Sequence, residues 1–483
     1  MDTHSMPDNS GPIEPVISGG STNVSQKGSV TKLLLGLAAL ALGQALQNGD
    51  GYLTFPAFIW LSIALVCAGA SLVFWRRSIP HVSQKILWVA LAIGLAWQLF
   101  QLLTTQPGIF ILPAQLRNLW QFQACVILGG ACALLSLAPK AWFSRKVRIG
   151  FIVSAFITVF LAGAWMIHAS PKPVIDVYLF QQTSSSALLQ GRDPYVLRPP
   201  YLDANMGFYG AALVKNGKLN ISNPYPPLSI YLSFIGYALA GDIRYSLLAA
   251  IMVTGLLMVF LRPGREALLA AYIFLFMPRL YYVLEQSWTE PLVLLLAVAV
   301  VWCAIHRPAW KFLALGLMIA SKQYLVFLSP LIFLLIPPGS PKRVWVRSSG
   351  WAVGSAFVVT APLAFWNFPA FFWDVGLAQW YQVSRIDSLS FAAVYARVFG
   401  QFPSQIIPFF VLAVVLFLLW RYGERSAAGF VSGLALGLGL FFAFSKQAFC
   451  NYYFLVFGLF CCALAALPTS DRLFVTEQKT SKS

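Results

Sequence analysis

Charged side chains are scarce in this chain of 483 residues, and acidic ones are the scarcest. Only 10% of the residues are Asp, Glu, Lys or Arg, whereas 59% are apolar, and the mean hydropathy is +0.72. Soluble domains carry about 25% charged residues, so this composition excludes a soluble enzyme and a disordered scaffold. The apolar residues form runs comparable to the ~20 residues that cross a bilayer as a helix. The sequence therefore indicates an all-α polytopic membrane protein.

Patterns that bind metals or form disulfides are also missing. The seven cysteines include no CxxC pair and no Cys/His cluster with zinc spacing, so we interpret them as small core residues and expect no metal and no cofactor. The net charge of +17 does not indicate nucleic acid as a partner. The basic residues lie mainly in short loops between apolar runs, where they act as topology signals.

Fourteen apolar runs are candidate membrane spans. Two short runs, 312–321 and 324–337, are interpreted as half-helices that meet at residues 321–324. The run 226–241 is interpreted as a re-entrant or interfacial helix, because counting it as a span would move basic loops to the exterior. The full set of spans is 33–46, 52–75, 86–105, 119–138, 149–169, 244–261, 267–284, 291–305, 312–321, 324–337, 349–366, 405–420, 427–445 and 452–468.

The Lys and Arg distribution places the N-terminus in the cytoplasm and two long segments, 170–243 and 367–404, on the exterior side. The segment 170–243 is rich in aromatic residues and far longer than an ordinary connection. The segment 367–404 has the character of an amphipathic interfacial stretch that could wall a binding site. The predicted organisation is a disordered cytoplasmic tail at 1–30, an accessory four-helix membrane segment at 31–140, a membrane core at 141–470 and a cytoplasmic tail at 471–483.

Three short motifs follow one another in the first exterior segment. Asp176 lies directly after the fifth span, Gly191-Arg192-Asp193-Pro194-Tyr195 comes about fifteen residues later, and Tyr225-Pro226-Pro227 opens the next apolar run. This order resembles the C-type (GT-C) superfamily of membrane glycosyltransferases over roughly residues 145–467. The resemblance is greatest to the polyprenol-phosphate-mannose-dependent α-1,2-mannosyltransferases. The spans at 33–138 have no counterpart in the minimal core of that family.

The resemblance implies an inverting glycosyltransferase on the exterior face of a bacterial plasma membrane. It would move a hexose, expected to be mannose, from a polyprenyl-phosphate donor to a lipid or glycan acceptor. Asp176 would be the base that takes the proton of the acceptor hydroxyl, and fixed cations would stabilise the departing phosphate. Membrane lipids are further expected partners. The expected substrate contacts are Tyr178, Arg192, Asp193, Tyr195, Tyr225, Arg279, Glu290, Lys322, Gln323, Lys446 and Tyr452.

Most of these residues also have a purely structural interpretation. Asp176 could cap the helix predicted at 177–189, and Gly191 to Tyr195 could simply end that helix. Glu290 could be a solvated loop residue, and the two lysines could reach for lipid headgroups. Lys322 nevertheless interrupts an apolar stretch at a real cost, which favours a phosphate partner. Arg279 could instead pair with Glu285 or a headgroup.

Two rival functions remain open. A transporter or flippase of lipid-linked saccharides would need ionisable residues near the membrane midplane and paired broken helices in two related halves. The acidic residues instead gather toward one face, and we find no obvious internal repeat. A non-catalytic membrane subunit of an envelope-assembly complex is the weaker alternative.

Overall fold

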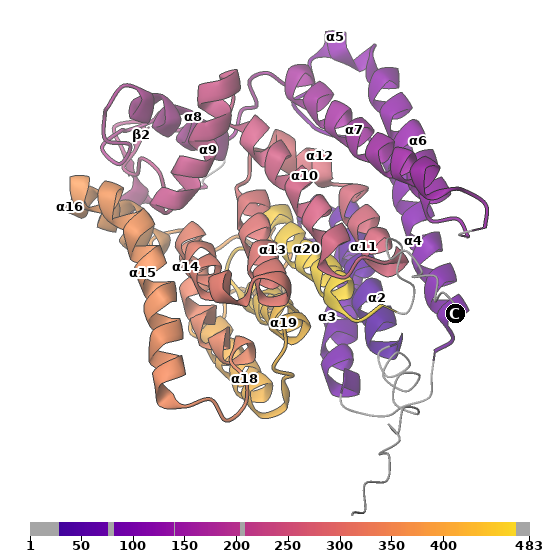
Figure 1. Cartoon of the computed structure of the whole chain (residues 1–483). Helices are drawn as coiled ribbons and strands as arrows, with labels where there is room; N and C mark the ends of the chain where they lie inside the picture. The colour runs from indigo at the N-terminus through magenta and orange to yellow at the C-terminus, as the bar shows by residue number, and fades with distance from the viewer. Residues whose placement is uncertain (1–28, 76–81, 140, 203–207, 470–483) are drawn as a thin grey trace, which may run out of the picture.

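The computed structural model describes residues 29–75, 82–139, 141–202 and 208–469. The described residues are mostly helical and include one two-stranded hairpin (Figure 1). Of the two predicted tails, only Ser29 and Val30 lie within the described residues, as the first residues of α2. The structure therefore confirms the all-α class.

Eight described helices are long and apolar enough to cross a membrane, as expected for a polytopic membrane protein. The predicted total of fourteen spans stays a prediction, because the other apolar helices are shorter. The eight are α2 (Ser29–Gln47), α3 (Phe55–Trp75), α4 (Gln84–Thr104), α6 (Leu119–Ser136), α7 (Arg145–Ala169), α10 (Arg244–Leu261), α15 (Lys342–Trp366) and α19 (Ala427–Phe444). The shorter ones are α9 (Pro227–Ala240), α13 (Glu290–His306), α14 (Lys311–Ser321), η4 (Gln323–Leu335), α18 (Ile407–Tyr422) and α20 (Cys450–Ala466).

Two of the predicted spans are interrupted in the structure. The run 267–284, expected to be continuous, is divided into α11 (Arg265–Leu275) and α12 (Leu280–Glu285) around Pro278. A proline inside a helix removes one backbone hydrogen bond and clashes with the preceding turn. The second interruption lies where the half-helices were expected to meet. Lys322 is extended, with φ −155° and ψ 133°, between α14 and the 3₁₀ helix η4.

The first membrane helix is packed into the core of the bundle. α2 lies against both α3 and α20, the last helix of the chain, and Figure 1 shows these segments side by side. At one end of α2 the Lys32 ammonium forms a buried ion pair with Glu266 of α11, at an Nζ–Oε2 distance of 2.7 Å. The Gln84 side chain of α4 donates to the other Glu266 oxygen at 2.6 Å. The helices before residue 140 are therefore fastened to the rest of the bundle by buried polar contacts as well as by apolar packing.

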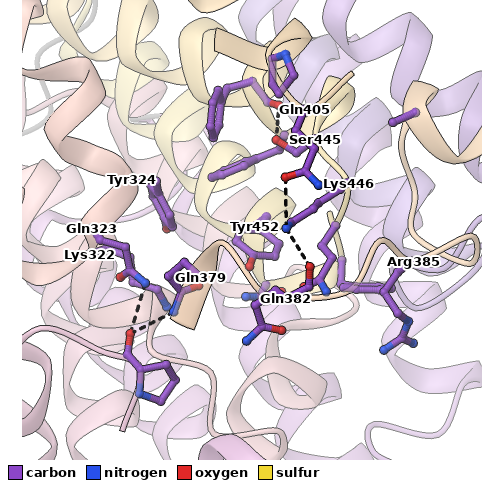
Figure 2. A pocket seen from close by; sticks show the side chains of 18 of the residues that line it. Lys322, Gln323, Tyr324, Gln379, Gln382, Arg385, Gln405, Ser445, Lys446 and Tyr452 are labelled. Carbon is purple, nitrogen blue, oxygen red and sulfur yellow. Dashed lines mark hydrogen bonds between the residues drawn. The ribbon is translucent and has the colours of Figure 1, made fainter. Parts of the chain in front are cut away.

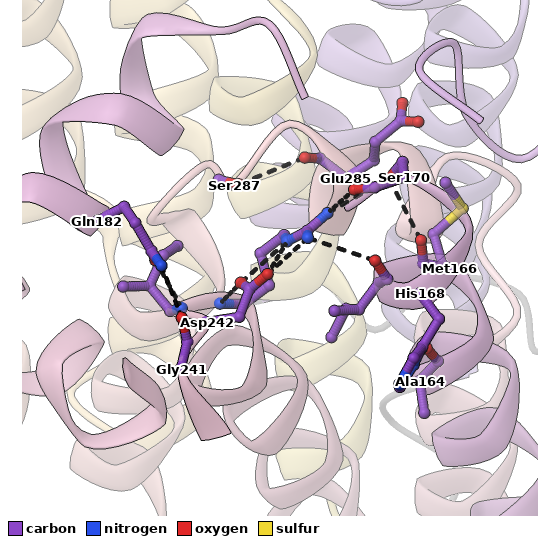
Figure 3. Close-up of polar contacts among 12 residues, drawn as sticks. Ala164, Met166, His168, Ser170, Gln182, Gly241, Asp242, Glu285 and Ser287 are labelled. Carbon is purple, nitrogen blue, oxygen red and sulfur yellow. Dashed lines mark hydrogen bonds and ion pairs between the residues drawn. The ribbon is translucent and has the colours of Figure 1, made fainter. Parts of the chain in front are cut away.

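The segment 170–243 folds over one end of the bundle. It contains α8 (Asp176–Leu189), a short hairpin of β1 (Val214–Lys215) and β2 (Lys218–Leu219), and α9. Asn216 and Gly217 both have positive φ, as the tight turn of a two-residue hairpin requires. The Gln182 side chain of α8 donates to the Gly241 carbonyl at 2.6 Å, which ties the two helices together (Figure 3).

A buried arginine fixes the start of α10 to the end of α7. Arg244 is fully buried, and its guanidinium pairs with Asp242 at 2.6 Å and donates to the Ser170 carbonyl at 2.7 Å. Figure 3 shows Asp242 and Ser170 on the two sides of this contact. Because α8 begins six residues after Ser170, this anchor also positions the first turn of α8.

The segment 367–404 packs against the segment 170–243. It is made of short helical pieces: α16 (Phe368–Phe371), η5 (Phe372–Gly376), η6 (Leu377–Gln379) and α17 (Phe391–Phe399). The buried Asp374 carboxylate accepts from the backbone N–H groups of Ser222 and Asn223 at 2.9 and 3.1 Å. The Trp373 indole donates to the Asn220 carbonyl at 2.6 Å. These bonds join two segments that lie about 150 residues apart in the chain.

Candidate active site

A cavity of ≈ 620 Å³ lies where the two long segments meet the end of the bundle. Seven parts of the chain line it: the turn between α2 and α3, both long segments, α12 with its connection to α13, the α14–η4 break, the start of α18, and the connection between α19 and α20 with the helix ends beside it. Nearly half of its lining residues are aromatic. The expected site residues that line it are Asp176, Tyr225, Lys322, Gln323, Lys446 and Tyr452.

Asp176 is the first residue of α8, and its half-buried side chain lines the cavity. One carboxylate oxygen accepts from the Val177 backbone N–H at 2.7 Å, which helps to satisfy the first turn of the helix. The other oxygen accepts a hydrogen bond from the Tyr209 hydroxyl. Burial raises the pKa of Tyr209 well above its usual value, and the neighbouring Asp176 charge adds to the rise. Asp176 therefore contributes to the helix start and faces the cavity at the same time.

Lys322 is buried at the break between α14 and η4, and its charge is balanced by a carboxylate. Its Nζ lies 2.9 Å from Glu290 Oε1 and donates to Thr289 Oγ1 at 2.7 Å. The Asn451 amide donates to the same Glu290 oxygen at 3.0 Å. Glu290 is completely buried, so the interpretation of a solvated loop glutamate is wrong. The Lys322 side chain is only 4% exposed and points to Glu290, which argues against the snorkelling interpretation for this residue.

Tyr225 covers the Lys322 ammonium, which lies 4.2 Å from the centre of its ring. Burial raises the pKa of the Tyr225 hydroxyl well above its usual value, with smaller contributions from Glu290 and Asp176. Both carboxylates are therefore near this phenol. The residue before Tyr225 is fixed as well, since Gln323 donates to the Pro224 carbonyl at 3.1 Å (Figure 2).

The Gly191–Tyr195 motif acts on the site indirectly. Gly191 has φ +65°, which ends α8 in the expected left-handed turn. Asp193 accepts from the backbone N–H of Tyr195 at 2.8 Å, and the buried Tyr195 hydroxyl donates to the Tyr225 carbonyl at 2.8 Å. Asp193 and Tyr195 thus position Tyr225 but do not line the cavity. Arg192 is exposed and donates to the Gln190 side chain.

Lys446 lines the cavity from the connection between α19 and α20. Its ammonium donates to the carbonyls of Trp380 and Gln382 at 3.2 and 2.7 Å, and to the Gln405 side chain at 3.4 Å (Figure 2). All three acceptors are uncharged. In the described part of the chain Lys446 takes part in no ion pair. Burial lowers its pKa, and a bound anion would favour its charged form.

Arg385 is a further cation in the cavity lining. The sequence indicated only that its segment, 367–404, could wall a binding site. Arg385 forms a two-point ion pair with Asp387, with Nε–Oδ1 and Nη2–Oδ2 distances of 2.8 and 2.6 Å. Its guanidinium lies 4.1 Å from the ring centre of Phe208 and 4.9 Å from that of Phe449. Figure 2 shows Arg385 and Lys322 on opposite sides of the cavity, with Tyr452 between them. The expectation that 367–404 walls the site agrees with this placement.

Tyr178 and Arg279, two further expected contacts, also lie outside the cavity lining. Tyr178 packs beneath the Arg244 guanidinium, whose central carbon lies 5.1 Å from the ring centre. Arg279 forms an ion pair with Asp50 at an Nε–Oδ1 distance of 2.7 Å. The alternative pairing of Arg279 with Glu285 is wrong, because the Glu285 carboxylate accepts from the backbone N–H groups of Ile109 and Phe110 at 2.7 and 2.8 Å.

The turn between α2 and α3 contributes two cavity residues that the sequence did not indicate. Asp50 and Tyr52 both line the cavity, and neither is among the site residues expected from the sequence. The local sequence Asn48-Gly49-Asp50-Gly51 is a turn signal that could have drawn attention to this acid. Within the residues that the structure describes, no group of three or more His, Cys, Asp or Glu side chains could hold a metal ion.

No protein-family model, no curated protein and no solved structure matches this chain.

Proposed function

We propose that this protein is an inverting glycosyltransferase that uses a polyprenyl-phosphate sugar, with mannose as the expected hexose. The acceptor is the hydroxyl of a lipid or glycan at the exterior face of a bacterial plasma membrane. The oxygen of that hydroxyl attacks the anomeric carbon as the bond from this carbon to the phosphate oxygen breaks. The phosphate leaves with the electron pair, and Asp176 takes the proton of the hydroxyl.

The observation that carries this proposal is that Asp176 and Lys446 line the same cavity. A carboxylate supported by the Tyr209 hydroxyl can accept a proton from a bound hydroxyl. Lys446 is the cavity cation best placed to receive a phosphate, because only neutral oxygens contact it in the described structure. Lys322 was expected in this role, but Glu290 already balances its charge. We therefore assign Lys322 to positioning Tyr225 above the site.

The location of the cavity also supports this chemistry. Its walls are apolar over much of their area and come from the two long segments and the ends of apolar helices. A water-poor site strengthens the attraction between a fixed cation and a developing phosphate charge. A lipid-linked donor would reach such a site from the bilayer, whereas nucleotide sugars stay in the cytoplasm. From the positive-inside rule we expect this end of the bundle outside the cell.

The test measures transfer of labelled mannose from a polyprenyl-phosphate donor to octyl α-D-mannopyranoside by purified protein in lipid vesicles. Asp176→Asn should lower kcat about 10²- to 10⁴-fold, the usual contribution of a general base. Lys446→Met should lower kcat about 10²- to 10³-fold, as loss of a charge-stabilising group does.

The matched control is Asp193→Asn, an acid in the same segment that lies outside the cavity lining. Its amide oxygen can still accept from Tyr195, so its turnover should stay within a few-fold of wild type. Equal turnover by wild type and Asp176→Asn would remove Asp176 from the mechanism. Movement of the donor across vesicles without a new glycosidic bond would favour the flippase.

A further inference from the structure

The α2–α3 turn presents a second carboxylate to the cavity. Asp50 and Asp176 are the two acidic residues among the described lining residues. Asp50 keeps 32% of its side chain exposed. One of its oxygens lies 2.7 Å from the Arg279 guanidinium, and the other makes no hydrogen bond to a described residue. A carboxylate oxygen in this position can accept hydrogen bonds from a ligand hydroxyl.

The turn is held in a strained conformation. Asp50 has φ +53° and Gly51 has φ +84°. A Cβ atom added at Gly51 would lie 2.0 Å from the backbone nitrogen of Cys450, so the turn is pressed against the start of α20. Strained non-glycine residues cluster at functional sites, where the surroundings hold them in place. Ser287, with φ +59°, precedes the cavity residue Trp288 on the facing element.

Contacts on three sides fix the position of Asp50. The backbone N–H of Leu53 donates to the Asp387 carbonyl at 2.8 Å, which joins the turn to the segment 367–404. The Tyr52 ring packs edge-on against Phe449 at 5.6 Å. Arg279, at the break between α11 and α12, holds the carboxylate itself. The side chain therefore has little freedom to turn away from the cavity.

The Tyr282 ring lies near this carboxylate, because its centre is 5.8 Å from the guanidinium of Arg279, the partner of Asp50. Tyr282 and Trp288 line the same part of the cavity, with ring centres 5.5 Å apart in an edge-to-face arrangement. A flat apolar ring beside a charged acceptor suits a pyranose, which has an apolar face and a rim of hydroxyls. Such amphipathic rings bury apolar area while leaving polar groups accessible.

Asp50 and Asp176 have different neighbours. The Asp176 charge acts on Tyr209 and Tyr225, whereas Asp50 contacts Arg279 and acts on Tyr52. The cavity thus has two acidic positions with separate surroundings. One carboxylate is enough to accept the proton of the reaction, which leaves Asp50 available for binding.

We infer that the α2–α3 turn is the acceptor site, where Asp50 binds the hydroxyls of a saccharide against Tyr282 and Trp288. Calling this saccharide the acceptor rests on the proposed function. Binding of the saccharide at the turn does not depend on catalysis. It gives the first membrane helices a role in substrate recognition. Asp50 binds the saccharide directly, and Arg279 positions Asp50.

The test uses octyl α-D-mannopyranoside with a photoreactive diazirine on the sugar ring. On irradiation, wild-type protein should be labelled within 48–54 or 282–288, and unmodified octyl mannoside should compete. Asp50→Asn should reduce this labelling about tenfold or more, since hydrogen bonds to charged groups are the stronger ones. Asp50→Glu keeps the charge and should retain more labelling than Asp50→Asn.

The matched control is Asn48→Ala, in the same turn but outside the cavity lining. It removes the hydrogen bond between the side chains of Gln44 and Asn48 and should leave labelling unchanged. In the transfer assay, Asp50→Asn should raise KM for octyl mannoside about tenfold, with the KM for the donor and the rate of donor hydrolysis retained.

The outcomes separate the two claims. Labelling at the turn by a wild-type protein that forms no product would refute the proposed function and leave the saccharide site standing. Product formation with equal labelling and equal acceptor KM in wild type and Asp50→Asn would overturn the inference about Asp50. Equal losses in Asn48→Ala and Asp50→Asn would also overturn it, because they would show a structural effect of the turn.

Discussion

Breaking the buried pair of Lys322 and Glu290 should be costly, whereas removing both charges should not. At the 2.9 Å Nζ–Oε1 distance, an effective dielectric constant of 20 gives an attraction of about 6 kcal/mol. The side chains are only 4% and 0% exposed, so neither charge can turn to water once its partner is gone. Removing one member of a buried pair typically costs about 3–5 kcal/mol.

The double substitution should recover much of that loss. In Lys322→Met/Glu290→Gln neither position keeps a charge, so no isolated charge is left at this site. The second Glu290 oxygen has no hydrogen-bond partner in the described structure, so the native pair is incompletely satisfied. Replacing such a pair with neutral side chains of similar volume is often close to neutral.

The measurement is unfolding by SDS titration from mixed micelles, applied to wild type, Lys322→Met, Glu290→Gln and the double variant. We expect each single variant to lose about 3–5 kcal/mol in unfolding free energy and the double variant to lose less than either. If the two single losses simply add in the double variant, the residues are not coupled. That result would refute the assignment of Lys322 to a balanced buried pair.

Two further predictions concern the loop end of the bundle. Burial raises the pKa of Asp374 to about 7, so its protonated form favours the folded state. This contribution is fully present below the unfolded pKa near 4 and is lost as the pH rises through about 7. Thermal unfolding between pH 5 and 8.5 should therefore show wild type losing stability relative to Asp374→Asn, and parallel curves would contradict the prediction. Gly51→Ala should be destabilised because it combines φ +84° with a clash at Cys450. Gly69→Ala, inside α3 with open space around its Cβ position, should be at least as stable as wild type, because alanine is the better helix former.

Local signals predicted the helical class and several turns correctly. The apolar runs indicated most of the described helices, and the Gly-Arg-Asp-Pro motif ended α8 at Gly191 as expected. The interruption at Lys322 was also visible in the sequence, because a lysine in an apolar run is expensive unless it has a partner. These features depend on a few neighbouring residues, which is why the sequence alone was informative.

Partners distant in the chain were not predictable in the same way. Nothing near Arg279 in the sequence indicates Asp50 as its partner, about 230 residues away, and the nearby Glu285 was the natural choice. Likewise Lys322 and Lys446 both follow a serine and precede a glutamine, yet one is paired with a carboxylate and the other is held by carbonyls. The difference arises from which element packs against each lysine.

The helix interruptions explain why so many polar groups meet at one end of an otherwise apolar bundle. In a bilayer, backbone that leaves the helix must find partners inside the protein or line a water-filled cavity. Lys322 at the α14–η4 break donates to Thr289 and Glu290, and Arg279 at the α11–α12 break pairs with Asp50. Each helix break thus places a basic side chain inside the protein, where it needs a fixed acidic partner. The cavity lies where the two breaks and their acidic partners come together. Its polar residues and its position therefore follow from the same breaks that end the helices.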